Sequence, residues 1–375
     1  MKKFICAILS AVLISMPLTA DANAVGEERI SLSAESAVLI DADSTNILCS
    51  KNHSQKMGMA STTKIMTALV AAENFDIDKT VTVAPEVVGI EGSSIYLCAN
   101  EKLTMEELLY ALLLQSANDA AAAIAYAVAG SIDAFADMMN GKAEEMGLRN
   151  THFTNPHGLY DEEHYTTAYD LAVITAHALR NEDIKQIVST YKKTIPSSDG
   201  ENTRLLVNHN KMLKLYDGAI GVKTGFTKAT GRCLVSAAAR DGLTLIAVTL
   251  NAPDDWNDHT KMLDFGFGNY ESLLIADVGS FAYALPVVGG EEDFVTLTNT
   301  GELRMTVPKI RGNISCKIEA VHRFEIAPTY RGTDAGRVTY SYEGFSCSSP
   351  LISAESIGCA KDTESFWDKL TSFFD

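Results

Sequence analysis

The chain has 375 residues, of which 46% are hydrophobic and 21% charged, and its formal net charge is -17 at pH 7. This length suffices for one large domain and a smaller one, and the composition is that of an ordinary globular protein. The excess of acidic residues argues against nucleic acid as a partner, because phosphate backbones are bound by clustered Lys and Arg. It argues equally against electrostatic docking on anionic lipid.

The N-terminus has the pattern of a secretory signal peptide. Lys2 and Lys3 precede an apolar run over residues 4–18, and Ala22-Asn23-Ala24 ends it with a small-x-small pattern. We therefore predict a signal peptide over residues 1–24, which is too short to span a bilayer in the mature protein. The mature protein is expected to work outside the cytoplasmic membrane.

Six cysteines remain after cleavage of the signal peptide, since Cys6 leaves with it. Export permits disulfides, but the sequence does not select among the possible pairings. Cys233 lies in an apolar strand and is expected to be a buried thiol. A bridge among the three cysteines of the C-terminal region stays open (Cys316, Cys347, Cys359).

The first half of the mature chain predicts a hairpin followed by a block of helices. Residues 37–40 and 46–49 flank a polar turn, and a helix containing Ser61 follows, with apolar residues at helical spacing. Thr104 opens a helix through residue 114 with the spacing of a capping box. The alanine-rich residues 119–128 form another helix, and Ser131 and Thr167 each cap one more.

The second half changes to strands. Residues 231–237 and 243–250 are apolar strands joined by a hairpin turn across residues 240–242, and a helix is expected over 255–270. This order predicts an α+β fold in which helices cover an antiparallel sheet. From residue 276 to 360 short alternating strands predict a second, small all-β domain.

The last segment, residues 361–375, is amphipathic. Phe366, Leu370, Phe373 and Phe374 fall on one helical face, with Trp367 beside them. Two alternatives are an interfacial membrane-binding helix and a short helix folded onto the β domain. We favour a weak membrane contact through residues 364–375, weak because the segment lacks a basic face.

Three short motifs carry the chemistry. Ser61 and Lys64 form S-x-x-K on the predicted helix, where residues three apart lie on the same face. Ser116-Ala117-Asn118 falls in a predicted loop between helices, and Lys223-Thr224-Gly225 just before the apolar hairpin. S-x-x-K, S-D-N and K-T-G are the signature of β-lactamases and penicillin-binding proteins. A lone S-x-x-K is common, but the three together in this order, in an exported chain, indicate a shared site.

With these motifs the chain resembles the low-molecular-mass penicillin-binding proteins, which are serine D-alanyl-D-alanine carboxypeptidases of the bacterial cell wall. Further segments with the same resemblance are residues 154–159, 221–227, 231–234 and 252–256. The resemblance implies a β-lactamase/transpeptidase-like domain over residues 25–275, followed by the β domain. It also implies an extracellular or wall-associated enzyme, with a peripheral contact to the outer face of the membrane as an option.

The residue types support particular roles. A serine hydroxyl needs a base to become a nucleophile, and Lys64 stands one turn from Ser61. Lys64 must be neutral for this task, which burial and the second cation Lys223 both favour, because each lowers its pKa. Ser116 is a natural proton relay to the leaving amine, and Asn118 can hydrogen-bond the substrate backbone.

The K-T-G strand is expected to hold the substrate. Lys223 and Thr224 would bind the terminal carboxylate of D-Ala-D-Ala, and Gly225 would permit close approach of the strand. By resemblance, the backbone N–H groups of Ser61 and Phe226 form the oxyanion hole. The implied reaction is acyl transfer on Ser61 that removes the terminal D-Ala of peptidoglycan stem peptides, with β-lactam antibiotics as inhibitors.

Two alternatives of other classes stay open. A β-lactamase is disfavoured because Ala117 replaces the usual middle Asp and no E-x-x-L-N segment supplies a deacylating glutamate. A catalytically inactive wall-associated scaffold is disfavoured by the intact motifs. His157, Asp161 and His164 are interpreted as a structural loop rather than a zinc site, since no H-E-x-x-H occurs. We expect neither a metal ion nor a cofactor.

Overall fold

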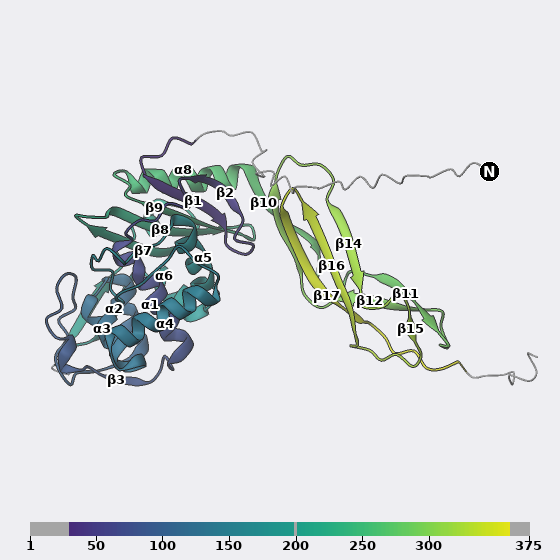
Figure 1. Ribbon diagram of the computed structural model, residues 1–375, viewed down its shortest axis with the longest axis horizontal. Coiled ribbons are helices and arrows are strands. Elements are labelled where there is room, and N and C mark those ends of the chain that lie inside the picture. The colour runs from purple at the N-terminus through teal and green to yellow at the C-terminus, as the bar shows by residue number, and fades with distance from the viewer. Residues whose placement is uncertain (1–29, 199–200, 361–375) are drawn as a thin grey trace, which may run out of the picture.

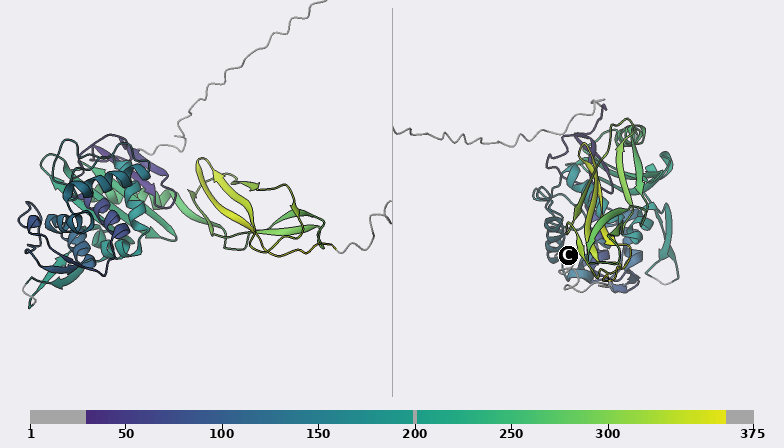
Figure 2. Two further views of the ribbon diagram at one scale, coloured as in Figure 1. Left: turned by 60° about the horizontal axis from the view of Figure 1, so that its bottom comes forward. Right: turned by 90° about the vertical axis from the view of Figure 1, so that its right-hand side faces the viewer.

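The computed structural model describes residues 30–198 and 201–360, so the predicted signal peptide and the C-terminal segment 361–375 lie outside the described residues. The described chain forms a helix-rich body built on a sheet and, beside it, an elongated β domain (Figure 1). The left view of Figure 2 shows the same two bodies end to end. The predicted fold class, a helix-covered antiparallel sheet with a separate small β domain, is confirmed.

The main sheet has five strands in the order β2-β1-β9-β8-β7, all paired antiparallel. Both predicted hairpins are confirmed, because β1 pairs with β2 and β8 pairs with β9. The motif strand β7 forms one edge of this sheet and β2 the other. The bounds are β1 Ser36–Asp41, β2 Ile47–Lys51, β7 Ala219–Thr227, β8 Gly231–Arg240 and β9 Leu243–Leu250.

Alternating residues of the sheet pack into two hydrophobic cores, one on each face. Val38 and Val248 face a large cluster with the helices α1 to α6, whereas Leu39 and Leu245 face a second cluster with α8. A strand buried on both faces is mostly apolar, as residues 243–250 are apart from their two threonines. The helices are α1 Lys64–Asn74, α2 Met105–Leu114, α3 Asn118–Ala129, α4 Ile132–Glu145, α5 Ala168–Leu179, α6 Glu182–Ser189, α7 Met212–Leu215 and α8 Asp255–Asn269.

The predicted helix starts are confirmed by their caps. Thr104 and Glu107 form a full capping box at α2. The Ser131 hydroxyl accepts from the Ala134 amide at α4, and Thr167 caps α5 in the same way. Each cap satisfies an amide that the first helical turn leaves without an intrahelical partner.

The prediction that Ser61 lies within an α-helix is wrong by one turn. Residues Ala60–Thr63 form a 3₁₀ turn, η1, and α1 begins only at Lys64. The Thr62 hydroxyl donates to the Met59 carbonyl and the Thr63 hydroxyl to the Ala60 carbonyl. Such side-chain bonds to the backbone compete with regular helical bonding, which explains the tighter turn.

Several short elements lie beside the helices α2 and α3. The hairpin of β5 Lys192–Pro196 and β6 Thr203–Val207 lies over α2, and β3 Thr80–Thr82 pairs with β4 Lys102–Thr104 before it. The turn η2 Pro85–Val87 lies between β3 and β4 in the chain.

The β domain is joined to the helix-rich body through a two-stranded sheet. β10 Tyr270–Ala276 follows α8 directly and pairs with β13 Leu303–Pro308. Tyr270 and Val307 belong to the core shared with α8, whereas Leu303 belongs to the core of the β domain. The predicted boundary at 275/276 stays a prediction, and β10 crosses it.

The six-stranded sheet of the β domain has the order β14-β16-β17-β12-β11-β15. Its strands are β11 Tyr283–Val288, β12 Phe294–Asn299, β14 Ser315–Ala320, β15 Glu325–Ile326, β16 Asp334–Tyr342 and β17 Phe345–Ser353. All pairs are antiparallel except β11 with β15.

The six cysteines of the described residues are free thiols, and Cys233 is buried as predicted. Over the described part of the chain, no single helix is long and apolar enough to cross a membrane. The consecutive helices α3 and α4 reach that length and apolarity only together, with a bend of 82° between them.

Candidate active site

The turn that carries Ser61 is pressed against the K-T-G strand. Ser61 is half-buried in η1, and Gly225 of β7 lies directly against the same turn. A Cβ atom added at Gly225 would lie 3.0 Å from the Ser61 backbone nitrogen and 3.1 Å from the Met59 carbonyl oxygen. Glycine at this position therefore permits a close approach to the Ser61 turn, in addition to the approach to substrate expected from the sequence.

The Lys64 side chain is fully buried and ends among three oxygen atoms. Its Nζ lies 2.9 Å from Ser61 Oγ, 2.7 Å from Asn118 Oδ1 and 2.6 Å from the His157 carbonyl oxygen. The Asn118 amide is oriented by its own nitrogen, which donates to the Glu91 carbonyl oxygen at 2.7 Å. That contact makes Oδ1 the atom that faces Lys64.

The surroundings favour a neutral Lys64 amine. Burial lowers the pKa of Lys64 well below its usual value, the Lys223 charge acts in the same direction, and Asp119 opposes both. A neutral amine has two N–H groups and one lone pair. Because Asn118 Oδ1 and the His157 carbonyl can only accept, the two N–H groups point to them. The lone pair is then directed at the Ser61 hydroxyl.

Lys223 is the second buried cation of the site. Only 1% of it is exposed, and its Nζ donates to the Thr224 carbonyl oxygen at 2.9 Å. Burial lowers the pKa of Lys223 to about 7. An anionic ligand beside this amine would raise its pKa, so that Lys223 would be protonated at neutral pH when the ligand is bound.

The remaining predicted site residues lie around this centre. Ser116 is buried in the corner between α2 and α3, with a left-handed backbone (φ 60°). Its hydroxyl makes no hydrogen bond to any described residue. Thr224 is half-buried and Phe226 is 65% exposed at the end of the motif strand.

Sequence reasoning missed the His157 carbonyl as a partner of Lys64. Asn155 Oδ1 accepts from the Gly158 amide at 2.7 Å, which shapes this loop. Gly158 has φ 84°, and a Cβ there would lie 1.9 Å from the Ala60 carbonyl oxygen. From the sequence, the segment T-N-P-H-G-L at 154–159 indicates only the family resemblance. The structure makes it one wall of the Lys64 pocket.

The comparisons with known proteins agree with this geometry. Residues 21–254 match the model of a protein family described as D-alanyl-D-alanine carboxypeptidase, a family of serine peptidases. The chain belongs to this family. It is 34% identical over 320 residues to the D-alanyl-D-alanine carboxypeptidase DacF of Bacillus subtilis, covering 83% of this chain and 82% of the relative.

Solved structures of penicillin-binding proteins have a similar fold over most of the chain. Penicillin binding protein 5 from Haemophilus influenzae has a TM-score of 0.73 and 28% identity, covering 89% of this chain and all of the other. A peptidoglycan synthesis regulatory factor (PBP3) from Streptococcus pneumoniae has a TM-score of 0.76 and 25% identity, covering 88% and 100%. The resemblance inferred from the motifs is thereby confirmed, and the chain is a serine peptidase of the D-alanyl-D-alanine carboxypeptidase family.

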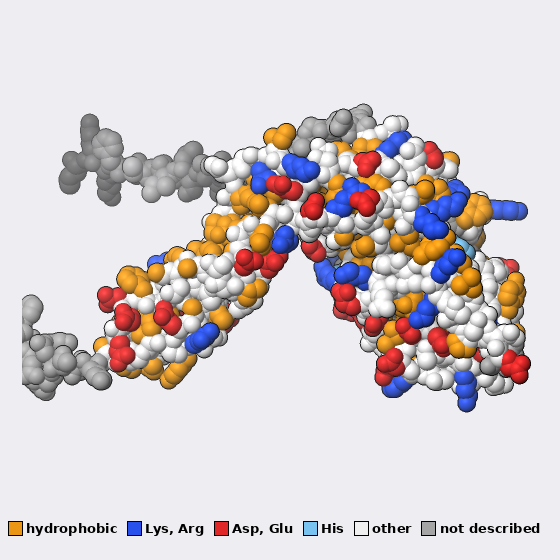
Figure 3. All heavy atoms as spheres, turned by 180° about the vertical axis from the view of Figure 1, so that it is seen from behind, with side chains coloured by type: hydrophobic (Ala, Val, Ile, Leu, Met, Phe, Trp, Pro, Cys, Tyr) orange, Lys and Arg blue, Asp and Glu red, His pale blue; other side chains and the backbone are white. Residues whose placement is uncertain are grey.

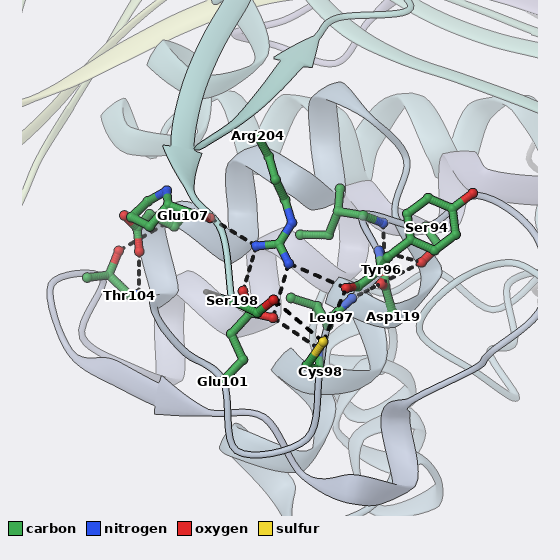
Figure 4. A network of polar contacts seen from close by, with 12 residues as sticks. Ser94, Tyr96, Leu97, Cys98, Glu101, Thr104, Glu107, Asp119, Ser198 and Arg204 are labelled. Atoms are coloured by element: carbon green, nitrogen blue, oxygen red, sulfur yellow. Dashed lines mark hydrogen bonds and ion pairs between the residues drawn. The ribbon is translucent and has the colours of Figure 1, made fainter. Parts of the chain in front are cut away.

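In this family member the loop before β4 is fixed at both ends (Figure 4). The Asp119 carboxylate accepts from the Ser94 hydroxyl at 2.6 Å and from the Leu97 amide at 3.0 Å. At the other end Arg204 of β6 forms an ion pair with the buried Glu101. Since Asp119 follows Asn118, this network also holds the start of α3, where Asn118 contacts Lys64.

The histidines of the 155–164 segment have hydrogen-bonding partners rather than a metal-binding arrangement. His164 contacts Thr63 and Thr154, and the Leu159 amide donates to His157 Nδ1. Burial lowers the pKa of His157 to about 3 and that of His164 to about 4. Within residues 30–198 and 201–360, no group of three or more His, Cys, Asp or Glu side chains is arranged to hold a metal ion.

Proposed function

We propose that this protein is a serine D,D-carboxypeptidase that removes the terminal D-Ala from peptidoglycan stem peptides ending in D-Ala-D-Ala. The observation that carries the proposal is the buried Lys64 amine, 2.9 Å from Ser61 Oγ, whose other two partners are acceptors only. An uncharged amine in this position acts as a general base for the serine hydroxyl.

The reaction proceeds through an acyl-enzyme on Ser61. Lys64 Nζ takes the hydroxyl proton while Oγ attacks the carbonyl carbon of the penultimate D-Ala. The backbone N–H groups of Ser61 and Phe226 donate to the resulting oxyanion. The C–N bond then breaks, the proton passes from Lys64 through Ser116 to the leaving amine, and D-Ala departs. Water hydrolyses the ester and frees the shortened peptide.

The substrate carboxylate is held by Lys223 and Thr224. A carboxylate next to the buried Lys223 amine raises the pKa of that amine and forms a charge-assisted hydrogen bond. Asn118 Oδ1 is occupied by Lys64, so its contribution to catalysis is to orient the base, and contact with the substrate backbone is secondary. β-Lactams acylate the same serine, and hydrolysis of the penicilloyl ester is slow because no deacylating glutamate is supplied by an E-x-x-L-N segment.

Labelling with fluorescent penicillin tests the proposal. The wild type is expected to carry one adduct on the peptide containing Ser61 and to release D-Ala from an N-acylated Lys-D-Ala-D-Ala peptide. Ser61→Ala is expected to lose both activities. Ser131→Ala is a matched control, because this serine only caps α4 and its loss costs about 1 kcal/mol of stability.

Other outcomes would favour the alternatives. A folded protein that neither labels nor releases D-Ala would indicate a scaffold, and rapid penicillin turnover would indicate a β-lactamase. An adduct on a residue other than Ser61 would overturn the mechanism.

We also propose that the protein is exported and acts at the cell wall, with residues 364–375 making a weak contact with the membrane surface. The support is the signal-like N-terminus and the apolar face of the C-terminal segment.

A further inference from the structure

A chain of buried hydrogen bonds lies behind the turn that carries Ser61. Ala60, directly before Ser61, has φ 47°, a backbone conformation that residues with a side chain rarely adopt. The Ala60 carbonyl oxygen accepts from the Thr63 hydroxyl at 2.7 Å, so the turn is closed by a side chain of its own. What holds the Thr63 hydroxyl therefore influences where Ser61 lies.

His164 holds that hydroxyl. Its side chain is buried, and its Nε2 lies 2.8 Å from Thr63 Oγ1. Its other nitrogen, Nδ1, lies 3.1 Å from the Thr154 backbone nitrogen. A backbone N–H can only donate, so Nδ1 is the unprotonated nitrogen and Nε2 carries the hydrogen. Each group in the chain then donates to the next. The Thr154 amide donates to His164 Nδ1, His164 Nε2–H donates to the Thr63 hydroxyl, and that hydroxyl donates to the Ala60 carbonyl.

We propose that His164 is a positioning residue for catalysis, which fixes the Ala60–Thr63 turn and thereby sets the Ser61 hydroxyl against the Lys64 amine. The inference rests on the proposed function, in which Ser61 is the nucleophile. Lys64 begins α1 immediately after Thr63, so the same contact constrains both members of the reacting pair. His164 touches neither the substrate nor the reacting atoms.

Burial keeps the His164 imidazole neutral, and thereby the chain of bonds intact, at neutral pH. Burial is the main reason that its pKa is lowered to about 4, and Lys64 and His152 act in the same direction while Asp161 opposes them. The Phe153 ring packs edge-on against the imidazole at 5.7 Å. A second proton on Nδ1 would face the Thr154 N–H at 3.1 Å, and the ring would have to turn its bond to the Thr154 hydroxyl at 3.3 Å, so protonation breaks the chain at its first bond.

The molecule contains a matched control. His259 of α8 is also fully buried, and its Nε2 lies 3.0 Å from the Thr249 hydroxyl. This pair lies on the face of the sheet covered by α8, whereas the Ser61 turn leads into α1 on the other face. The two pairs therefore allow a comparison. Loss of the His164–Thr63 bond affects the turn that carries Ser61, whereas loss of the His259–Thr249 bond does not.

The test compares H164Q, H164L, H259Q and H259L by acylation rate with fluorescent penicillin and by melting temperature. H164L is expected to acylate about 10- to 100-fold more slowly, since a small misplacement of reacting groups can cost about 100-fold. H164Q, whose amide can accept from Thr154 and donate to Thr63, is expected to stay within about threefold of the wild type. The His259 variants are expected to lower the melting temperature and to leave acylation unchanged.

A second variant and the pH profile make the outcome decisive. T63V keeps the side-chain shape and removes the hydroxyl. It is expected to slow acylation as H164L does. T63V therefore still tests the proposal if H164L does not fold. Below about pH 5 the wild type should lose acylation more steeply than H164Q, which has no imidazole to protonate. Equal rates for H164L, T63V and the wild type would overturn the proposal, as would a loss that H259L reproduces. A wild type that does not label at Ser61 would instead overturn the proposed function.

Discussion

Two buried lysines define the site at the scale of single residues. Lys64 is held among acceptors and Lys223 lies on the edge strand, and burial lowers the pKa of each. An ammonium group is strongly hydrated, so removing it from water favours the neutral amine. The fold thus supplies the neutral amine that the proposed base Lys64 requires. In the proposed complex, a substrate carboxylate beside Lys223 restores the charge of that lysine and not that of Lys64.

Replacement of Lys64 by methionine tests the base. Lys64→Met fills the same pocket without an amine, so the protein is expected to fold while acylation falls about 10³-fold, within the range of general-base effects. Penicillin labelling measures the rate and circular dichroism the fold. Lys79→Met, at an exposed lysine, is the matched control. Wild-type labelling by folded Lys64→Met would contradict the assignment of Lys64 as the base.

The pKa of Lys223 predicts a pH dependence of stability. The unfolded lysine titrates near 10.5 and the folded one at about 7, so between these values the unfolded state binds more protons. The cost of burying this amine is constant below about pH 7, shrinks as pH rises from 7 to 10.5 and then vanishes. Stability therefore rises with pH in this window, by about 1.4 kcal/mol per unit for one group.

Urea unfolding of Lys223→Met measures this contribution. The variant is expected to be more stable than the wild type at pH 7 and to have a flatter stability profile from pH 7 to 10. An unchanged slope would show that Lys223 keeps its ordinary pKa. Lys79→Met should leave the slope as it is.

At the scale of elements, the site depends on how closely η1 approaches β7. The 3₁₀ turn places Ser61 outside the regular helix, where its backbone amide is not committed to an intrahelical bond. The edge strand β7 reaches this turn because Gly225 has no side chain. Two elements far apart in the sequence are therefore in contact, and Ser61, the proposed nucleophile, lies where they meet.

Gly225→Ala is expected to separate the two elements. The added Cβ would lie 3.0 Å from the Ser61 nitrogen, which is tighter than ordinary contacts, and backbone must shift to relieve it. We expect acylation to fall at least about tenfold, because the reacting groups are displaced. Gly141→Ala in α4 is the control, since nothing lies within 4 Å of its added Cβ. It should raise stability by about 0.5–1 kcal/mol and leave acylation unchanged.

At the scale of the whole molecule, the β domain extends away from the catalytic body. Acidic side chains gather at its far end, beside the last described residues (Figure 3). The residues there include the exposed Glu291, Glu292 and Asp293, and the Ala360 amide donates to the Gly289 carbonyl at the end of β11. The predicted amphipathic segment thus starts from an acidic surface, which repels anionic lipid.

This arrangement predicts a membrane contact that prefers uncharged lipid. The chain has two tryptophans, so Trp256→Phe leaves Trp367 as a reporter. Zwitterionic vesicles are expected to shift its fluorescence to shorter wavelength, more than anionic vesicles do, and Phe373→Ser with Phe374→Ser should reduce the shift. If the fluorescence is already blue-shifted without vesicles and does not respond to them, the segment folds onto the protein instead.

Much of this protein follows from local patterns. The caps at Thr104, Ser131 and Thr167, and the hairpin of β8 and β9, depend on neighbours in the sequence, and the sequence predicted them. The three motifs also indicate a β-lactamase or penicillin-binding protein, because their residue types and order are tied to one chemistry. Neither inference requires knowledge of distant contacts.

The burial, contacts and pKa of the site residues were decided by the tertiary structure alone. Whether Lys64 is buried or solvated depends on α3 and the 154–159 loop closing around it, and its contact with the His157 carbonyl involves a backbone atom that no motif specifies. The orientation of Asn118 depends on the Glu91 carbonyl, and the link from His164 to Thr63 spans 101 positions. The pKa of a lysine is set by the solvent and charges around it, and only the folded chain determines those.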